Sequence, residues 1–331
     1  MKVIVIGDGG WGTTLAALLS RKGVDVALWS AFPDYAAQMS RTRENVKFLP
    51  AIAIPEKVAI VSPASGALGA FDLAVAAVPT QYLRAALRSA AKQTAPLSSI
   101  VSVVKGIEND TLERPTQIIA DALKPKRLAV LSGPSHAEEV ARDLPATVVS
   151  ASSDDEFSRH VQTVFSTDRF RVYTSGDMLG VELAGALKNV IAIAAGICDG
   201  AGLGDNAKAA LITRGLVEIA RLGEEMGARR ATFAGLAGMG DLITTCFSPF
   251  GRNLAVGRAI GKGETLAQIL SRMEQVAEGV ATTRSTKALA TKHKVEMPIT
   301  EEVHRVLFED KPPKRAVSDL MQRGLKPEED R

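Results

Sequence analysis

The first half of the chain alternates short apolar runs with longer stretches in which apolar residues recur at helical spacing. The runs are rich in Val, Ile, Leu and Ala and end at Gly, Pro or polar residues, which is typical of strands buried on both faces. This alternation predicts a largely parallel sheet with helices on both sides. The predicted strands are 2–6, 24–29, 58–61, 73–78, 100–104, 128–131, 147–149 and 170–173, and the predicted helices are 13–19, 81–92, 115–123 and 155–165.

The second half of the chain has a different pattern. Strand signals fade after residue 178, and long Ala-, Leu- and Ile-rich stretches follow, which predict helices. We therefore expect two domains, an α/β domain of residues 1–180 and an all-α domain of residues 181–331. A last short helix is predicted at 316–321, and the charged segment from Lys326 is expected to be disordered.

A glycine motif follows the first predicted strand. Gly7, Gly9 and Gly12 form G-x-G-x-x-G, with a strand before the motif and a helix after it. Gly7 permits a tight turn, Gly9 lets the backbone approach a pyrophosphate, and Gly12 lets helix and strand pack closely. Phosphates bind well at such a helix N-terminus. The alternative is a glycine-rich turn without a ligand, but the context favours a Rossmann-like dinucleotide site.

The residue after the second strand usually selects the dinucleotide. An acid there binds the ribose hydroxyls of NAD, whereas a basic residue binds the 2′-phosphate of NADP. This chain has Ser30 followed by Ala and Phe, and Asp34 lies too far along. Arg41 and Arg43 reach the site only if the loop folds back. The choice between NAD and NADP stays open.

A lysine in an apolar stretch is the main candidate for acid–base chemistry. Lys188 is surrounded by Ala, Leu and Val across 181–190, so a buried helix would lower its pKa toward neutrality. A proton donor needs such a pKa. The alternative is that the aliphatic stem of Lys188 lies along the surface and its ammonium reaches water.

Other polar residues lie where a site is expected, at the carboxyl ends of strands and at helix starts. Three turns, at 78–81, 105–108 and 132–136, follow predicted strands. The first would lie over a cofactor, and the other two bring Lys105 and Ser135 toward a substrate. Each is also compatible with ordinary loop chemistry.

In the helical half, Asp241 and Thr245 share one face if their segment is helical. Arg252 and Asn253 open a predicted helix, where a guanidinium and free N–H groups would hold phosphate. A surface arginine is the commoner case. Glu278 would pair with Arg252, touch a nicotinamide ribose, or remain a solvated acid.

Composition excludes several other classes. The 40 basic and 37 acidic residues are spread along the chain, so no basic block indicates nucleic acid. Cys198 and Cys246 have no metal-ligand spacing with each other or with the four histidines, so no metal is expected. The N-terminus lacks a signal-peptide core, and the longest apolar region contains Glu182 and Lys188. We expect a cytoplasmic protein without membrane insertion.

The motifs together resemble bacterial NAD(P)-dependent glycerol-3-phosphate dehydrogenase over nearly the whole chain. The resemblance lies in the glycine loop and in 105–106, 132–135, 182–189, 209–215, and 240–246 with 251–253, and the segments 187–190 and 241–246 are far more specific than the glycine loop. It implies a Rossmann domain and a helical domain that interconvert dihydroxyacetone phosphate and sn-glycerol 3-phosphate, using NAD(P)H and no metal, for phospholipid synthesis. It also implies a homodimer.

The resemblance further implies the roles of individual residues. Lys188 would be the proton donor or acceptor, assisted by Asp241, Lys105 and Thr245. Two positions depart from the family pattern: Gly251 stands where bacterial members commonly have Ser, and Ser30 to Phe32 replaces a frequent basic residue. The implied substrate contacts are Lys105, Gly133, Ser135, Lys188, Asn189, Asp241, Gly251, Arg252 and Asn253, and the implied cofactor contacts are Gly7, Gly9, Gly10, Trp11, Gly12, Ser30, Lys105, Ala137, Arg252, Val276 and Glu278.

Two other functions share parts of this pattern. A β-hydroxyacid dehydrogenase of similar architecture also uses a helix lysine, but typically with Asn four residues later, where this chain has Ala192. A dinucleotide sensor without catalysis has no need of a buried proton donor, so the combination of Lys188, Asp241 and Thr245 disfavours it.

Overall fold

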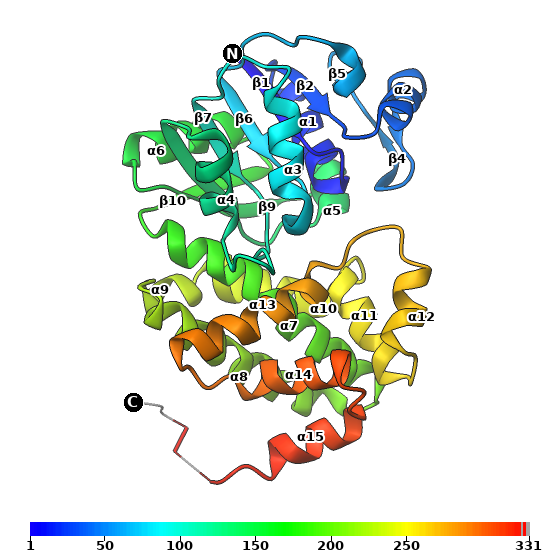
Figure 1. The fold of residues 1–331 in the computed structure, drawn as a ribbon, viewed down its shortest axis with the longest axis vertical. Coiled ribbons are helices and arrows are strands. Elements are labelled where there is room, and N and C mark those ends of the chain that lie inside the picture. The colour runs from blue at the N-terminus through cyan, green and yellow to red at the C-terminus, as the bar shows by residue number, and fades with distance from the viewer. Residues whose placement is uncertain (326, 329–331) are drawn as a thin grey trace.

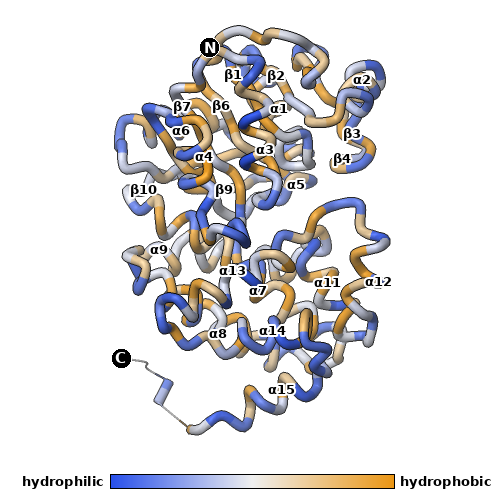
Figure 2. The backbone as a smooth tube through the Cα atoms, viewed as in Figure 1, coloured by the Kyte–Doolittle hydropathy of each residue, from blue (hydrophilic) through white to orange (hydrophobic). Residues whose placement is uncertain are grey.

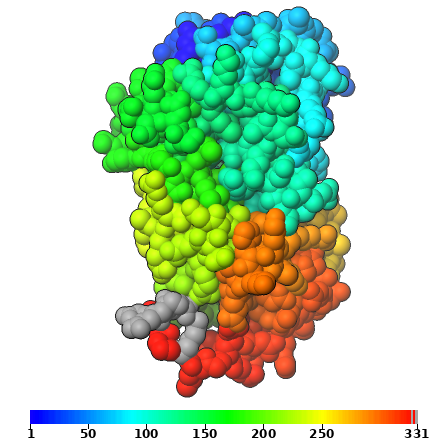
Figure 3. Space-filling view, turned by 60° about the vertical axis from the view of Figure 1, so that its left-hand side comes forward, coloured from blue at the N-terminus to red at the C-terminus, as the bar shows by residue number. Residues whose placement is uncertain are grey.

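The computed structural model describes residues 1–325, 327 and 328, so Lys326 and most of the tail predicted to be disordered lie outside the described residues. An α/β half lies above a helical half (Figure 1). The predicted fold class, an α/β sheet domain followed by helices, is confirmed. Figure 3 shows the helical half, yellow-green to red, directly below the α/β half.

One large sheet forms the centre of the α/β half. Its order within the described residues is β10-β9-β8-β7-β6-β1-β2-β5, and all neighbouring pairs except β8 and β9 are parallel. The prediction of a largely parallel sheet therefore holds, with β9 and β10 reversed. The strands are β1 (Lys2–Ile6), β2 (Asp25–Trp29), β5 (Ala59–Val61), β6 (Leu73–Ala76), β7 (Ser99–Ser102), β8 (Arg127–Ser132), β9 (Ala146–Ala151) and β10 (Phe170–Ser175).

Helices cover both faces of this sheet because its strands are apolar on both sides. On one face, α1 (Gly10–Arg21) and α6 (Asp155–Phe165) pack against alternate strand residues such as Val5. On the other face, α3 (Thr80–Ala91) and α4 (Pro115–Leu123) pack against the intervening residues such as Ile4. Figure 2 shows hydrophilic segments concentrated at the periphery, as in α2 (Pro33–Thr42).

A small hairpin between β2 and β5 was not predicted. After α2, β3 (Glu44–Asn45) pairs antiparallel with β4 (Leu49–Ala53). Asn45 is fully buried, and its side-chain amide donates to the Asp8 carbonyl (2.6 Å) and to Thr13 Oγ1 (2.7 Å). These hydrogen bonds hold the hairpin against the glycine loop.

Helix α7 (Met178–Gly200) forms the core of the helical half and is buried from Gly180 to Cys198. It packs so closely on α11 (Arg252–Gly261) that a Cβ at Gly257 would lie 2.0 Å from the Ile193 carbonyl oxygen. The other helical elements are α8 (Gly204–Glu225), α9 (Arg230–Phe233), the π-helical turn Leu236–Gly240, α10 (Asp241–Phe247), α11 (Arg252–Gly261), α12 (Leu266–Ser271), α13 (Glu278–His293), α14 (Pro298–Phe308) and α15 (Pro313–Met321). The division of the chain at residue 180 stays a prediction.

Helix α7 alone among the described helices is long and apolar enough to span a membrane, but its most apolar window is entirely buried within the protein. Near its start, Glu182 is buried and accepts hydrogen bonds from the Thr116 backbone N–H (2.7 Å) and from Thr116 Oγ1 (2.7 Å), while Arg114 pairs with it. Thr116 lies in the first turn of α4, so Glu182 caps that helix from the other half. The buried acid therefore has a structural partner.

Candidate active site

A cavity lies where the two halves meet, at the carboxyl ends of β1, β6, β7 and β8. Ligands of doubly wound sheets bind at this edge. Most residues predicted for the site line this cavity, and Gly7, Gly12, Ser30 and Gly133 do not. The predicted residues that line it are Gly9, Gly10, Trp11, Lys105, Ser135, Ala137, Lys188, Asn189, Asp241, Thr245, Gly251, Arg252, Asn253, Val276 and Glu278.

Lys188 lies at the base of the cavity with 5% of its surface exposed, which contradicts the surface alternative. Its Nζ donates to Asp241 Oδ1 (2.7 Å) and to Thr245 Oγ1. Asp241 and Thr245 share one face of α10, as their spacing predicted. Burial lowers the pKa of Lys188 to about 8, although the Asp241 carboxylate opposes that shift.

A second lysine shares the same carboxylate. Lys105 Nζ donates to Asp241 Oδ2 (2.7 Å) and to the Gly133 carbonyl (3.0 Å), which also accepts from Ser135 Oγ (2.9 Å). Burial would raise the pKa of Asp241, but the two ammonium groups outweigh it and hold that pKa below its usual value. Gly133 therefore orients two lining side chains through its carbonyl.

Two amides connect the segments around the cavity. Asn189 donates to the Lys105 carbonyl (3.0 Å) and accepts from Asn253 Nδ2 (3.0 Å). Asn253 Oδ1 accepts in turn from the Gly279 backbone N–H (2.9 Å). This chain of hydrogen bonds fixes the loop after β7 to α7, α11 and α13. In each of the two side-chain amides it uses the carbonyl oxygen and one N–H donor.

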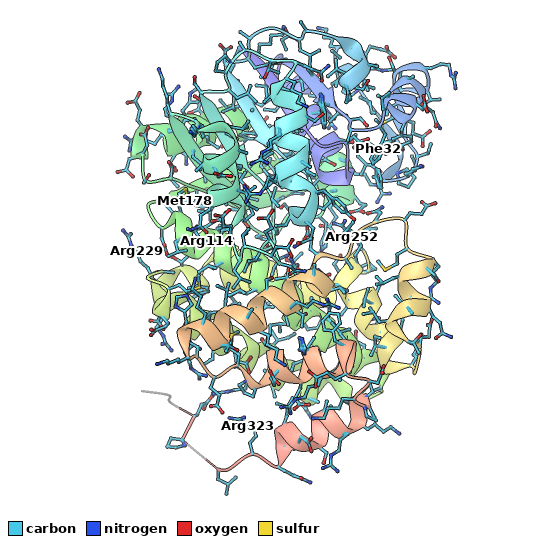
Figure 4. The ribbon with its side chains drawn as sticks, in the orientation of Figure 1. Phe32, Arg114, Met178, Arg229, Arg252 and Arg323 are labelled. Atoms are coloured by element: carbon cyan, nitrogen blue, oxygen red, sulfur yellow. The ribbon has the colours of Figure 1, made fainter. Side chains whose placement is uncertain are left out.

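Arg252 begins α11 at the mouth of the cavity, and Figure 4 shows it where the two halves meet. Its guanidinium donates to the Val276 carbonyl (3.2 Å). Within the described residues no carboxylate forms an ion pair with it, so a cation is available to an anionic ligand. Gly251, the residue before it, is buried and contributes no side chain.

Of the alternatives for Glu278, the ion pair with Arg252 is not formed, and the side chain is buried rather than solvated. Its Oε1 accepts from the backbone N–H of Thr80 (2.7 Å), the first residue of α3. Its Oε2 is buried, lacks a hydrogen-bond partner, and belongs to a residue that lines the cavity. Burial raises the pKa of Glu278 to about 7. The acid thus connects the two halves and leaves one oxygen for a ligand.

The glycine loop has the backbone geometry that its motif requires. Gly7 has φ +115°, in the left-handed region, and a Cβ there would lie 2.6 Å from the Ala77 carbonyl oxygen. A Cβ at Gly12 would lie 2.0 Å from the Gly7 carbonyl oxygen, so α1 can approach the end of β1 this closely only with glycine at position 12. Neither residue lines the cavity, and Gly9 and Gly10 do so in their place.

Comparison with known proteins identifies the family. The model for the N-terminal part of NAD-dependent glycerol-3-phosphate dehydrogenase matches residues 2–158, and the model for its C-terminal part matches 177–318. The chain belongs to the NAD-dependent glycerol-3-phosphate dehydrogenase family. The resemblance seen in the sequence is therefore confirmed.

Individual relatives of this dehydrogenase family cover nearly the whole chain. It is 50% identical to "Glycerol-3-phosphate dehydrogenase [NAD(P)+] 2" of Salinibacter ruber, over 98% of this chain and 96% of that protein. It is 50% identical to the glycerol-3-phosphate dehydrogenase [NAD(P)+] of Geobacter metallireducens, over 99% and 98%. The crystal structure of glycerol-3-phosphate dehydrogenase from Coxiella burnetii superposes with a TM-score of 0.90 at 39% identity, over 97% and 99%.

One residue that the family resemblance assigned to the cofactor lies beneath the surface. Ser30 is fully buried, and its Oγ donates to Asp8 Oδ2 (2.7 Å). Arg43, considered for a 2′-phosphate, instead donates to the carbonyls of Pro55 and Val58. The side chain of Arg43 is therefore already bound to the protein.

Several lining residues of this dehydrogenase were not predicted. Phe48 comes from the unpredicted hairpin, and Phe250 lies beside His136 with ring centroids 6.2 Å apart. His136 belongs to the polar turn at 132–136, so the predicted site residues Gly133 and Ser135 beside it could have indicated that it lines the site. Its Nε2 is buried and unpartnered, and burial together with Lys188 and Lys105 lowers its pKa to about 4. His136 is thus neutral at pH 7.

The described residues contain no group of three or more His, Cys, Asp or Glu placed to hold a metal ion. Cys198 and Cys246 are both buried and free.

Proposed function

We propose that this chain catalyses the reversible, NAD(P)H-dependent reduction of dihydroxyacetone phosphate to sn-glycerol 3-phosphate, with Lys188 as the general acid and base. The observation that carries the proposal is the buried Lys188 ammonium, held by Asp241 and Thr245 in a cavity that also includes the glycine loop. We further propose that the product supplies glycerophospholipid synthesis in the cytoplasm.

The residues around the glycine loop fit a dinucleotide. Gly9 and Gly10 line the cavity at the start of α1, whose first turn has no capping side chain, so its N–H groups are available to a pyrophosphate. The unpartnered Glu278 Oε2 is an acceptor for a ribose hydroxyl. When bound, the reduced nicotinamide supplies the hydride. Trp11, Ala137 and Val276 line the same cavity and are proposed to contact the cofactor.

Lys188 is proposed to donate the proton that the ketone oxygen needs as it gains negative charge. With a pKa of about 8, the ammonium is largely protonated at neutral pH yet gives up its proton readily. The Asp241 carboxylate fixes the direction of the Nζ, and the Thr245 hydroxyl supports it. Lys105, on the other oxygen of Asp241, adds positive charge beside the developing alkoxide. In the oxidation direction, neutral Lys188 accepts the hydroxyl proton.

Arg252 is proposed to bind the substrate phosphate. Its guanidinium has no carboxylate partner among the described residues and lies at the first residue of α11, where N–H groups and the helix dipole also favour an anion. Gly251 leaves only backbone at the preceding position. Ser135 and the remaining N–H donors of Asn189 and Asn253 are proposed to contact the substrate's other oxygens.

Initial rates test the proposal. Dihydroxyacetone phosphate is supplied with NADH or NADPH, and the nicotinamide absorbance is followed; 3-oxo acids serve as rival substrates. We expect reduction of dihydroxyacetone phosphate with at least one cofactor and at least about 100-fold lower kcat/KM on the 3-oxo acids, because these lack the phosphate that Arg252 binds. Cofactor binding without turnover of dihydroxyacetone phosphate would exclude the proposed reaction.

A homodimer is a separate part of the proposal, taken from the family. Sedimentation at micromolar concentration is expected to give twice the chain mass of 35.0 kDa. A single species at the chain mass would contradict it.

A further inference from the structure

An acidic side chain lies inside the glycine loop, at the second residue of the motif. Asp8 directly follows Gly7, and its Oδ2 accepts a hydrogen bond from Ser30 Oγ (2.7 Å). Strands β1 and β2 are parallel neighbours with Ile6 opposite Trp29, which brings the residues after the two strands together. The carboxylate of Asp8 therefore lies beside Ser30, the residue that follows β2.

The position of Asp8 is fixed by its neighbours. Its carbonyl accepts from Asn45 Nδ2 (2.6 Å) and from Thr13 Oγ1 (3.3 Å). Ser30 is itself held, because its Oγ accepts from the Phe32 backbone N–H (3.2 Å). Asp8 nevertheless keeps 7% of its surface exposed, and its Oδ1 is not among the buried unpartnered atoms of the described residues. Oδ2 is thus held by Ser30, and no hydrogen bond joins Oδ1 to another of the described residues.

Few cations near Asp8 are free to bind a phosphate. Arg43 is held by two backbone carbonyls and lies 3.6 Å from a carboxylate oxygen of Glu56. Lys47 is the lysine that acts electrostatically on Asp8, and its Nζ lies 4.9 Å from the centre of the Tyr35 ring. In Figure 4 the labelled Phe32, just beyond Ser30, marks the same edge of the α/β half. At this edge the guanidinium of Arg43 is thus already bound to the protein, and Lys47 is the cation that offsets the charge of Asp8.

In doubly wound dinucleotide domains the adenosine ribose lies where the glycine loop meets the end of β2, and an acid there binds the 2′-hydroxyl. We propose that Asp8, positioned by Ser30, accepts a hydrogen bond from the adenosine 2′-hydroxyl and repels a 2′-phosphate, so that this chain selects NAD(H) over NADP(H). This inference rests on the proposed dinucleotide site and resolves the choice that Ser30 alone left open.

Direct binding tests the inference without catalysis. Calorimetric titration of the full chain with NAD⁺ and, separately, with NADP⁺ gives two dissociation constants. We expect NAD⁺ to bind at least roughly 10-fold more tightly, since an acid facing a phosphate is a repulsive contact. Asp8→Asn keeps the shape of the side chain and removes its charge, so we expect the ratio to fall by roughly 10-fold, mainly through tighter NADP⁺ binding.

Two further variants complete the test. Asp34→Asn removes the same charge from an exposed position on α2 and is expected to leave the ratio unchanged. Asp8→Ser also removes the carboxylate but has a smaller side chain. If one of the two Asp8 variants fails to fold, the other still gives the ratio of the two dissociation constants. Equal or tighter NADP⁺ binding by the wild type, or an unchanged ratio in the folded Asp8 variant, would overturn the inference. Failure to bind either dinucleotide would instead remove the proposed function.

Discussion

Replacing Asp241 with Asn changes the charge beside the proposed acid while nearly preserving its shape. Asp241 accepts from Lys188 Nζ at 2.7 Å and from Lys105 Nζ at 2.7 Å, and only 3% of its side chain is exposed. The variant leaves two ammonium groups facing each other without the carboxylate that joins them. The loss of the carboxylate and the uncompensated charge of Lys105 both disfavour the charged form of Lys188, so its pKa is expected to fall.

The size of the shift follows from the contact. An opposite charge at this range changes a pKa by roughly 1–3 units. From a pKa of about 8 in the wild type, the expected value in Asp241→Asn is roughly 5–7. At pH 7.5 the protonated fraction of Lys188 would drop from about three quarters to about one quarter or less. Reduction, which needs the ammonium, should slow accordingly.

The assay is kcat/KM for dihydroxyacetone phosphate reduction between about pH 5 and 10, since this profile reports the pKa of groups in the free enzyme. The wild type should lose activity above about pH 8, and Asp241→Asn above roughly pH 5–7. Thr245→Val is the matched control because it removes a hydrogen bond but no charge, and its midpoint should stay within about half a unit. A midpoint near 8 in a folded Asp241→Asn protein would refute the electrostatic reasoning.

Three more predictions concern other parts of the chain. Arg252→Ala should raise KM for dihydroxyacetone phosphate by roughly 10- to 100-fold in steady-state assays, since a charge-assisted contact of about 1.5–3 kcal/mol is lost. An unchanged KM would place the phosphate elsewhere. Glu218 accepts from the Ile299 backbone N–H (2.7 Å), and burial raises its pKa to about 7. Because the folded-state pKa lies above the unfolded one, Glu218 contributes stability below about pH 4.5, and at most about 3 kcal/mol of it is lost as the pH rises through 7. In urea unfolding, Glu218→Gln should therefore lose less stability than the wild type between pH 5 and 8. Equal losses in the two proteins would contradict this. Gly257→Ala should destabilise by about 1–3 kcal/mol or more in urea, because its Cβ would meet the Ile193 carbonyl at 2.0 Å. Gly324→Ala, with nothing within 4 Å, should be neutral, and equal stability of both variants would contradict the packing argument.

The strands and central helices were predictable because buried strands and helices have distinct apolar periods. The reversal of β9 was not, since a strand buried on both faces carries an apolar run that reads the same in either direction. The hairpin of β3 and β4 was missed because two short strands give too little alternation to detect. Its residue Asn45 is polar and fully buried, a combination that only tertiary contacts explain.

The site was predictable where motifs carry its chemistry and less so where function depends on packing between the halves. Lys188, Asp241 and Lys105 lie far apart in the sequence yet meet through two hydrogen bonds to one carboxylate. An ion pair with Arg252 was one alternative for Glu278, but its carboxylate binds the start of α3 at Thr80, which no local pattern indicates. Ser30 follows β2 as expected, whereas its contact with Asp8 depends on the register of β1 and β2.

The most direct measurement is turnover of Lys188→Met together with its dinucleotide affinity. Methionine keeps an unbranched side chain in the buried site and removes the ammonium. If Lys188 donates the proton, reduction of dihydroxyacetone phosphate should fall by roughly 100- to 10,000-fold while the dissociation constant for the dinucleotide changes by no more than about threefold. Turnover within about threefold of the wild type, at the same affinity, would show that another group supplies the proton.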